Sequence, residues 1–384
     1  MSILLTTEQL VLKKHFRDFV DSEIIPIANR QDETEYLDNS IIEKMSALGF
    51  LGAIIPSKYG GKEWDAVTLA LLHEEIGRGC ASIRSLLTVH EMVALAINRW
   101  GSDEQRENWL PRLATGDIIG AFALSEPDTG SDAKSVQLTA VFEGGRFLLS
   151  GVKKWITMGQ IANLFIIIAQ YDNKPTAFLV ERQSEGLSAR PIKGLMGFRA
   201  SMGAELLLDD CDIPGENIIG SCGVGLSHIA QTCLDHGRFV VACGCVGLAQ
   251  ACLEDSVNYA RERKQFGERL SKNQLIQKMI AEMSVKTKAA RHLCQYAALL
   301  RASGDPNSIN ETLAAKYFAS TILDKITSDA VQIHGANGCS SSYRVGRYYR
   351  DAKIYTIIEG TTQMHELLIS KNTMLSIKRA QKVT

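Results

Sequence analysis

Apolar residues recur at helical spacing through the first third of the chain. A capping box at Thr6-x-x-Gln9 precedes the first run and predicts a helix that extends to Pro26. The apolar face of this helix consists of Leu12, Phe16, Phe19, Val20 and Ile24. The same periodicity predicts helices within residues 41–48, 66–79 and 90–100, with a loop at 56–61. We therefore expect a helical domain over residues 1–117.

The pattern changes to short β-rich runs from residue 118 onward. Runs at 136–142 and 147–157 flank Gly144-Gly145, which predicts a β-hairpin. Further runs at 164–171, 177–181 and 205–208 are separated by Asn, Gly and Pro, which are turn formers. A β-domain is therefore expected over residues 118–228.

Long helices are predicted for the last part of the chain. No proline lies between residues 215 and 305, and none follows Pro306, so nothing interrupts a long helix there. We expect helices over 235–263 and 273–303, and a third after a capping box at Ser308-x-x-Glu311. A helical bundle should fill residues 229–384. The order of helices, strands and helices indicates an α+β class, and it does not favour a Rossmann fold because no GxGxxG motif follows a predicted strand.

Composition and charge exclude several classes of function. Forty-two basic and 43 acidic side chains leave a formal net charge of -1, which argues against nucleic acid as a partner. The nine cysteines form no CxxC pair, so we expect reduced thiols and no metal site, with Cys243 and Cys245 as small packing residues. The first five residues lack a basic n-region, and apolar runs such as 164–169 are too short to span a bilayer. We expect a cytoplasmic protein without a membrane segment.

One carboxylate, Glu359, lies in an apolar run directly before a Gly-Thr-Thr turn. Ile354, Ile357 and Ile358 are expected to surround it with a low dielectric, which raises the pKa of a carboxyl group toward working pH. A carboxylate tuned in this way can remove a weakly acidic proton from carbon. The stretch is equally compatible with an ordinary helix start, in which Glu359 lies near the N-terminus and Thr361 or the following threonine is the cap.

Two stretches of the expected β-domain offer groups that could bind a flat or phosphorylated ligand. Residues 121–132 combine a turn at Pro127 and Gly130 with several hydroxyls, although this is also simply a Ser/Thr-rich turn. On a regular strand, Trp155 and Thr157 share one face and could flank a flat ring. The alternative for this tryptophan is a half-buried core aromatic.

Two stretches of the expected bundle also offer ligand contacts. Residues 261–267, together with Gln274, place guanidinium groups and an aromatic ring at a helix end. They suit a pyrophosphate clamp, but a solvated basic helix terminus explains them as well. The glycines of 332–338 permit a close backbone approach, or they only end a helix.

The order and spacing of these elements resemble the acyl-CoA dehydrogenase family over essentially the whole chain. The matching stretches are 56–61, 125–132, 154–157, 263–267, 332–338, 350–354 and 359–361. The resemblance implies an N-terminal helical domain, a middle β-barrel domain and a C-terminal four-helix bundle that hold FAD between them. It also implies a homodimer or homotetramer, because some FAD contacts come from a neighbouring subunit.

The resemblance assigns roles residue by residue. The residues that would line the flavin are Phe122, Leu124, Ser125, Ser131, Trp155 and Thr157, and those that would contact FAD in the same subunit from the bundle are Thr361 and Gln363. The residues that would reach the FAD of a neighbouring subunit are Arg263, Phe266, Gln274, Gln332 and Gly335. The residues that would contact substrate are Ser131, Arg238 and Gly360.

In such enzymes a glutamate removes the α-proton of an acyl thioester while the flavin accepts a hydride from the β-carbon. Glu359 matches this catalytic base. A few members carry the base on the helix near the start of the bundle, but Gly237 occupies that position here. The resemblance implies that the backbone N–H of Glu359 and a flavin ribityl hydroxyl stabilise the thioester oxygen.

Fatty-acid enzymes of the family commonly have Tyr where this chain has Ile358. This difference indicates that the substrate is not an ordinary fatty acyl group. Three stretches, 83–90, 197–205 and 235–246, resemble a branch found in polyketide, nonribosomal-peptide and antibiotic biosynthesis. That branch oxidises small acyl groups on an acyl carrier protein, including hydroxymalonyl- and aminomalonyl-type extender units. We expect such a substrate, with electron transfer flavoprotein as electron acceptor. The alternatives are a short- or branched-chain acyl-CoA dehydrogenase of catabolism and a catalytically silent acyl-thioester-binding protein.

Overall fold

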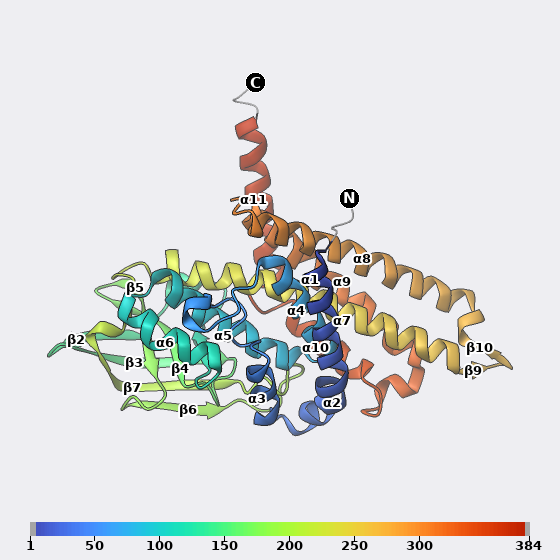
Figure 1. Cartoon of the computed structure of the whole chain (residues 1–384), viewed down its shortest axis with the longest axis horizontal. Helices are drawn as coiled ribbons and strands as arrows, with labels where there is room; N and C mark the ends of the chain where they lie inside the picture. Colours follow the sequence, from blue (N-terminus) through green and yellow to red (C-terminus); the bar gives the residue numbers. More distant parts are fainter. Residues whose placement is uncertain (1–4, 381–384) are drawn as a thin grey trace.

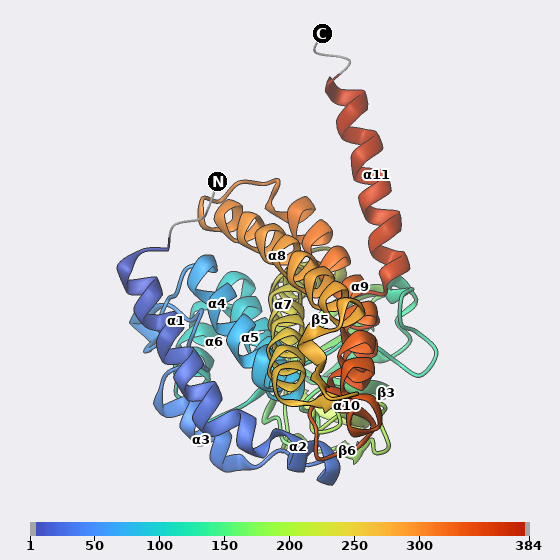
Figure 2. The same cartoon turned by 90° about the vertical axis from the view of Figure 1, so that its right-hand side faces the viewer.

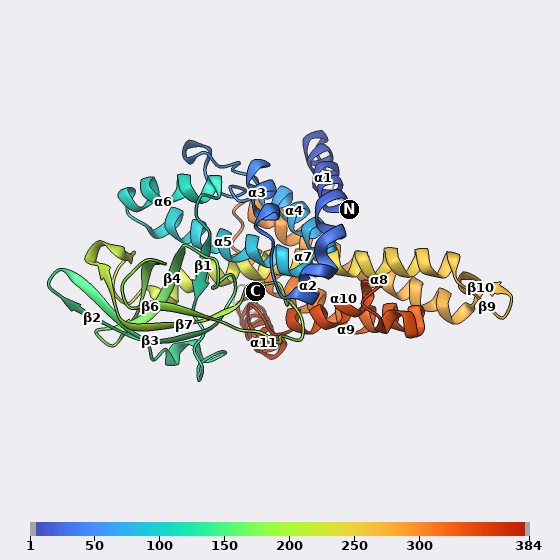
Figure 3. The same ribbon diagram turned by 90° about the horizontal axis from the view of Figure 1, so that it is seen from below.

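The computed structural model describes residues 5–380, so most of the N-terminal stretch inspected for a signal lies outside the described residues. Figures 1 and 3 show the β-sheet at one end of the molecule and long helices that run from it to the opposite end. The N-terminal helices pack along one side of these long helices. The arrangement matches the expected α+β order of helices, strands and helices.

The N-terminal helices are α1 (Thr7–Phe19), α2 (Ile25–Thr34), α3 (Asn39–Ala47), α4 (Ala66–Gly79), α5 (Ala81–Trp100) and α6 (Asp103–Thr115). The predicted capping box at Thr6 and Gln9 is confirmed. The prediction that the first helix extends to Pro26 is wrong, because a π-helical turn, η1 (Val20–Ile24), follows α1 and Pro26 lies in the first turn of α2. A missing N–H group costs little at that position, so the proline does not end the helical path.

Within the described residues, one sheet contains β1 (Gly120–Ala123), β2 (Thr139–Glu143), β3 (Arg146–Ile156), β4 (Leu164–Tyr171), β5 (Lys174–Glu181), β6 (Leu187–Pro191), β7 (Ala204–Pro214) and β8 (Ile218–Ile219). The strand order is β6-β7-β3-β2-β4-β5-β8, with β1 parallel to β4. The predicted hairpin is confirmed, since β2 and β3 pair antiparallel across Gly144 and Gly145 with Phe142 opposite Phe147. Strand β1 packs against α5.

The C-terminal helices are α7 (Gln231–Glu262), α8 (Gln274–Ala302), α9 (Ser308–His334), α10 (Val345–Tyr355) and α11 (Thr362–Ala380). A small hairpin of β9 (Lys264–Gln265) and β10 (Glu268–Arg269) joins α7 to α8. The predicted capping box at Ser308 is wrong, because Ser308 is already the first helical residue and Asn307 is the N-cap without a side-chain cap bond. Figure 2 shows α11 projecting away from the body of the molecule.

Helix α7 is the centre of the bundle, and it packs against α4, α5, α8 and α9. With its preceding turn it forms the segment Gly225–Glu262, the one helix in the described residues that is long and apolar enough to cross a membrane. However, 72% of the tested window is buried inside the protein. Packing in the core therefore accounts for its apolar composition.

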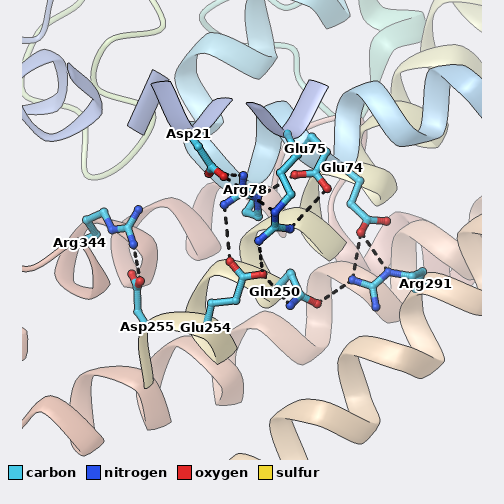
Figure 4. Close-up of polar contacts among 10 residues, drawn as sticks. Asp21, Glu74, Glu75, Arg78, Gln250, Glu254, Asp255, Arg291 and Arg344 are labelled. Carbon is cyan, nitrogen blue, oxygen red and sulfur yellow. Dashed lines mark hydrogen bonds and ion pairs between the residues drawn. The ribbon is translucent and has the colours of Figure 1, made fainter. Parts of the chain in front are cut away.

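A polar network fastens the N-terminal helices to the bundle (Figure 4). Arg78 of α4 donates to Asp21 (2.6 Å) and to Glu75 (2.8 Å), and Glu254 of α7 accepts from Arg17 of α1 (2.8 Å). Arg78 and Glu75 are buried. Because paired buried charges fix the contact geometry, this network holds α1 and α4 against α7.

Candidate active site

Glu359 lies in a strained turn between α10 and α11. Its φ is 56° and that of the following Gly360 is 93°, so two consecutive residues occupy the left-handed region. Glycine adopts this conformation easily, whereas glutamate does so only where the surroundings enforce it. Helix α11 begins at Thr362, and the Thr361 hydroxyl accepts from the Met364 N–H at 3.4 Å. The turn therefore does precede a helix start, as the simpler interpretation proposed, but Glu359 lies outside the helix.

Two cations, one half-buried and one fully buried, hold the carbonyl groups of this turn. Arg238 of α7 donates through Nε to the Glu359 carbonyl (3.1 Å), and Lys316 of α9 donates through Nζ to the Gly360 carbonyl (2.9 Å). Lys316 is fully buried, and burial lowers the pKa of its amine to about 8. Charged donors make stronger hydrogen bonds than neutral ones, so helices α7 and α9 together stabilise the unusual backbone of the turn. The predicted substrate contacts Arg238 and Gly360 thus lie beside the predicted base.

The Glu359 carboxylate is enclosed by helices from other parts of the chain. The residue as a whole is half-buried, but its Oε2 atom is buried and has no hydrogen-bond partner. A Cβ atom at Gly237 would lie 2.6 Å from this Oε2 and 2.1 Å from the Met92 Cε. Gly237 therefore does more than lack a carboxylate, because the missing side chain leaves the space that Glu359 occupies.

Enclosure raises the pKa of Glu359 to about 7, as predicted, and the positive charges of Arg238, Lys316 and Arg84 oppose the rise. The expected isoleucine shell is wrong at Ile357, however, whereas Ile354 and Ile358 are half-buried and pack against the core. The side chain of Ile357 is 50% exposed, so it cannot shield the carboxylate. Shielding comes from α5 and α7 instead, which approach the turn from distant parts of the sequence.

Arg84 of α5 is a site residue that the sequence reasoning missed. It is fully buried, and it donates through Nε to the Tyr355 hydroxyl (3.2 Å) and through Nη1 to the Thr88 hydroxyl (2.7 Å). Its Nη2 group is buried without a partner. A Cβ at Gly244 would lie 2.3 Å from the Arg84 Cδ, so this glycine of α7 makes room for the side chain. The signal in the sequence was the helical spacing of Arg84, Thr88 and Glu91 within a helix whose other residues are mostly apolar.

The two predicted ligand-binding stretches of the middle domain lie side by side. The backbone N–H of Lys154 donates to the Ser125 carbonyl at 2.9 Å, which joins the end of β3 to the loop after β1. Lys153 is fully buried, and it donates to the Leu124 carbonyl (3.0 Å) and to the Glu126 carboxylate (2.7 Å). This buried ion pair pins the loop.

Trp155 is exposed to solvent and is not part of the core, because its side chain is 57% exposed. The prediction that Trp155 and Thr157 share one face of a regular strand is wrong. The pairing of β3 with β7 shifts register between Lys153 and Ile156, β3 ends at Ile156, and Trp155 has a φ of 63°. The bulge turns the indole outward. The other predicted flavin contacts lie in β1, in the loop after it and just beyond the end of β3. Four of them are half-buried, namely Phe122, Leu124, Ser125 and Thr157, and Ser131 is exposed.

The remaining predicted FAD contacts lie elsewhere in the subunit. Phe266 is fully exposed at the β9–β10 hairpin, at the end of the molecule opposite the sheet (Figures 1 and 3). Also exposed are Arg263, Gln274, Gln332, Gly335 and Gln363, whereas Thr361 is half-buried. One subunit therefore does not bring the hairpin to its own Trp155. The contact of the FAD of a neighbouring subunit with Arg263, Phe266, Gln274, Gln332 and Gly335 stays a prediction, as does the contact of Thr361 and Gln363 with FAD in their own subunit.

The residues around Trp155 fit a flat heterocycle. The exposed indole and Thr157 belong to the segment at the end of β3, and the backbone bond from Lys154 to Ser125 brings this segment against the loop after β1. A flavin ring can stack on an aromatic side chain and can form hydrogen bonds with hydroxyl groups. We expect Phe122, Leu124 and Ser131 to complete this surface.

Comparison with known proteins identifies the family that the sequence motifs resemble. Family models for the acyl-CoA dehydrogenase N-terminal, middle and C-terminal domains match residues 6–117, 121–211 and 224–374. The chain is 39% identical to an acyl-CoA dehydrogenase of Bacillus subtilis over 372 residues, which cover 95% of this chain and 98% of the relative.

Solved structures of similar fold cover almost the whole chain. Butyryl-CoA dehydrogenase from Megasphaera elsdenii superposes with a TM-score of 0.94 at 33% identity, covering 97% of this chain and all of that one. The prolyl acyl carrier protein oxidase AnaB gives 0.91 at 29%, covering 96% and 100%. A chain in the structure of the electron transferring flavoprotein of Acidaminococcus fermentans gives 0.93 at 36%, covering 97% and 99%. The chain therefore belongs to the acyl-CoA dehydrogenase family of FAD-dependent oxidoreductases, which act on the CH–CH group of acyl thioesters.

Proposed function

We propose that this acyl-thioester dehydrogenase oxidises a small acyl group tethered to an acyl carrier protein, in the formation of hydroxymalonyl- or aminomalonyl-type extender units. The observation that carries the proposal is the unpartnered Nη2 of Arg84 near the base. A buried N–H group without an acceptor costs about 1–3 kcal/mol. A substrate with an oxygen substituent on its acyl chain would supply the acceptor, whereas a plain alkyl chain would not. The likeness to AnaB supports a carrier-protein thioester.

The residues of the site divide the reaction between them. Glu359 takes the α-proton, for which a carboxylate with a pKa near 7 is well matched at neutral pH. Bound FAD supplies the two-electron acceptor for the hydride that leaves the neighbouring carbon. The product thus has two hydrogens fewer than the substrate. Arg238 and Lys316 hold the turn that aims the carboxylate, and Arg84 would orient the acyl substituent.

A short- or branched-chain acyl-CoA dehydrogenase of catabolism fits the family equally well. The Bacillus subtilis relative and the butyryl-CoA dehydrogenase structure favour it. A catalytically silent binding protein is disfavoured, because Glu359 is retained with the environment of a tuned base.

The partners follow from the same proposal. We propose electron transfer flavoprotein as the acceptor, supported by the similar chain in the Acidaminococcus fermentans structure. We also propose a homodimer or homotetramer, supported by the fully exposed Phe266, which would otherwise leave a large ring in water.

Anaerobic bleaching of the visible flavin band tests the substrate. The holoenzyme is titrated with small hydroxyacyl or aminoacyl groups on a carrier protein, and in parallel with short acyl-CoAs such as butyryl-CoA. We expect bleaching by the carrier-bound set. The matched variant Arg84→Leu should lose turnover of oxygen-bearing acyl groups by about tenfold or more while its flavin band is unchanged, because one charged hydrogen bond contributes about 1.5–3 kcal/mol. Much faster turnover of a short acyl-CoA than of any carrier-bound group would overturn the proposal in favour of catabolism.

A further inference from the structure

Behind the active site, three buried side chains from three helices form a hydrogen-bonded triad. His73 of α4 approaches the Glu91 carboxylate of α5 through Nε2, at 2.9 Å and 3.1 Å from its two oxygens. His236 of α7 approaches the same carboxylate through Nε2 at 2.8 Å. His73 and Glu91 are fully buried, and His236 is 5% exposed. Since a carboxylate only accepts hydrogen bonds, both imidazoles donate to it.

Interactions with the two imidazoles stabilise the ionised form of Glu91. Burial by itself would raise the pKa of Glu91, but the two imidazoles outweigh it and lower the pKa to about 2. Burial lowers the pKa of His73, whose Nδ1 has no partner. In this arrangement His73 donates to Glu91 through Nε2. Arg84, on the same helix as Glu91, is the nearby charged group that acts on both His73 and Glu359.

The triad is joined to the catalytic base through consecutive residues of α7. His236 is followed by Gly237, which lies against the Glu359 carboxylate, and by Arg238, which donates to the Glu359 carbonyl. On the other helix, Glu91 is followed by Met92, whose Cε lies against Gly237. The hydrogen bond from His236 to Glu91 thus ties together the two segments that enclose the carboxylate.

Part of the contact between α4 and α7 is made through glycines, although α7 also buries Phe239, Val240 and Val241 nearby. A Cβ at Gly77 of α4 would lie 2.7 Å from the Cα of Gly244, so the two helices meet there through glycines. Glycine contacts allow close approach but provide no side chain that interlocks with the neighbouring helix. A residue turns by about 100° per position along a helix, so a small rotation of α7 would move both Gly237 and Arg238 relative to the base.

We propose that His73, Glu91 and His236 are positioning residues for Glu359. By holding α7 at one rotation against α4 and α5, the triad keeps Gly237 beside the carboxylate and Arg238 on its carbonyl. None of the three is a catalytic residue, because each acts through α7 rather than on the thioester.

The test compares variants of the holoenzyme by the pH profile of kcat/KM and by separate kcat and KM values. His236→Leu removes the donor and keeps the volume, and His236→Gln keeps a donor near the position of Nε2. We expect His236→Leu to lower kcat by about tenfold to a hundredfold, the usual cost of a small misplacement, with little change in KM. In His236→Leu the acid limb, which is the fall of kcat/KM on the acidic side of the pH profile, should move below pH 7, because water then reaches the Glu359 carboxylate. His236→Gln should recover most of both properties.

Glu75→Gln is the matched control. Glu75 is also a buried carboxylate of α4, two residues from His73, but it pairs with Arg17 and Arg78, which also contact Glu254 of α7, and not with the triad. We expect this variant to lose stability and to keep the wild-type acid limb. The proposal is overturned if His236→Leu also loses only stability while its kcat and acid limb stay at wild-type values.

A second variant covers the case in which His236→Leu does not fold. Glu91→Gln keeps the shape and one acceptor of the triad, and it should move the acid limb in the same direction by a smaller amount. A wild-type limb in Glu91→Gln would overturn the positioning role. If neither variant folds and retains FAD, the positioning role is also overturned, because the triad would then be needed for the stability of the whole fold.

Discussion

Replacing Glu359 with glutamine tests the central electrostatic inference, since it removes the charge and keeps the shape. The pKa of this carboxyl rises from 4.5 to about 7 because it is enclosed. At 1.36 kcal/mol for each tenfold change, the rise corresponds to about 3 kcal/mol. The folded state binds this proton more tightly than the unfolded chain does. Ionisation of Glu359 therefore costs nothing below pH 4.5, costs progressively more between pH 4.5 and 7, and costs about 3 kcal/mol above pH 7.

Glu359→Gln should accordingly be more stable than the wild type at pH 8 by up to about 3 kcal/mol, and equally stable at pH 4. The measurement is the free energy of unfolding in urea at matched protein and FAD concentrations. Glu126→Gln serves as control, because burial raises the pKa of this carboxyl but its pairing with Lys153 outweighs burial and lowers it, so removing its charge should be destabilising at pH 8. No gain in stability for Glu359→Gln at pH 8 would refute the argument that enclosure destabilises the ionised base.

The same pKa predicts the kinetics. In the wild type, kcat/KM should fall about a hundredfold between pH 8 and pH 5, because only about 1% of a group with a pKa near 7 is ionised at pH 5. Glu359→Gln should keep the flavin band and lower the rate of anaerobic flavin reduction by about 10²–10⁴-fold, which is the usual contribution of a general base. A flat wild-type profile from pH 5 to 8, or a near wild-type rate in the variant, would remove Glu359 from this role.

Three further predictions concern the surroundings of the base and the loop beside Trp155. Gly237→Ala places a methyl group 2.6 Å from the Glu359 Oε2, so it should cost about 1–3 kcal/mol of stability and lower kcat, which melting curves and steady-state rates would check. Lys316→Met removes a cation that lowers the pKa of Glu359, so the acid limb of kcat/KM should move above pH 7; an unchanged limb would contradict this. Lys153→Met leaves the Glu126 carboxylate buried without its cation at a cost of about 3–5 kcal/mol, and the weakened loop should release FAD more readily in equilibrium dialysis.

Much of the fold follows from local patterns in the sequence. The helix predicted over 66–79 and the strand predicted over 164–171 have the bounds of α4 and β4. These segments have unambiguous periodicity and clear flanking residues, such as the Asp65 cap of α4. The errors lie where several local solutions have similar energies, as at Pro26, which fits the first turn of a new helix, and at Ser308, where Asn307 is the N-cap instead.

The sequence by itself determined the helix–strand–helix order and the family motifs, and it singled out Glu359 as the candidate base, because these are properties of short segments. Only the tertiary structure decided what surrounds that glutamate. Gly237 and Glu359 are far apart in the chain, as are Lys316 and Gly360, and periodicity does not say which helices meet. The pKa of Glu359, the unpartnered Arg84 and the His73–Glu91–His236 triad all depend on such contacts, since burial and pairing of charges exist only once the helices are packed.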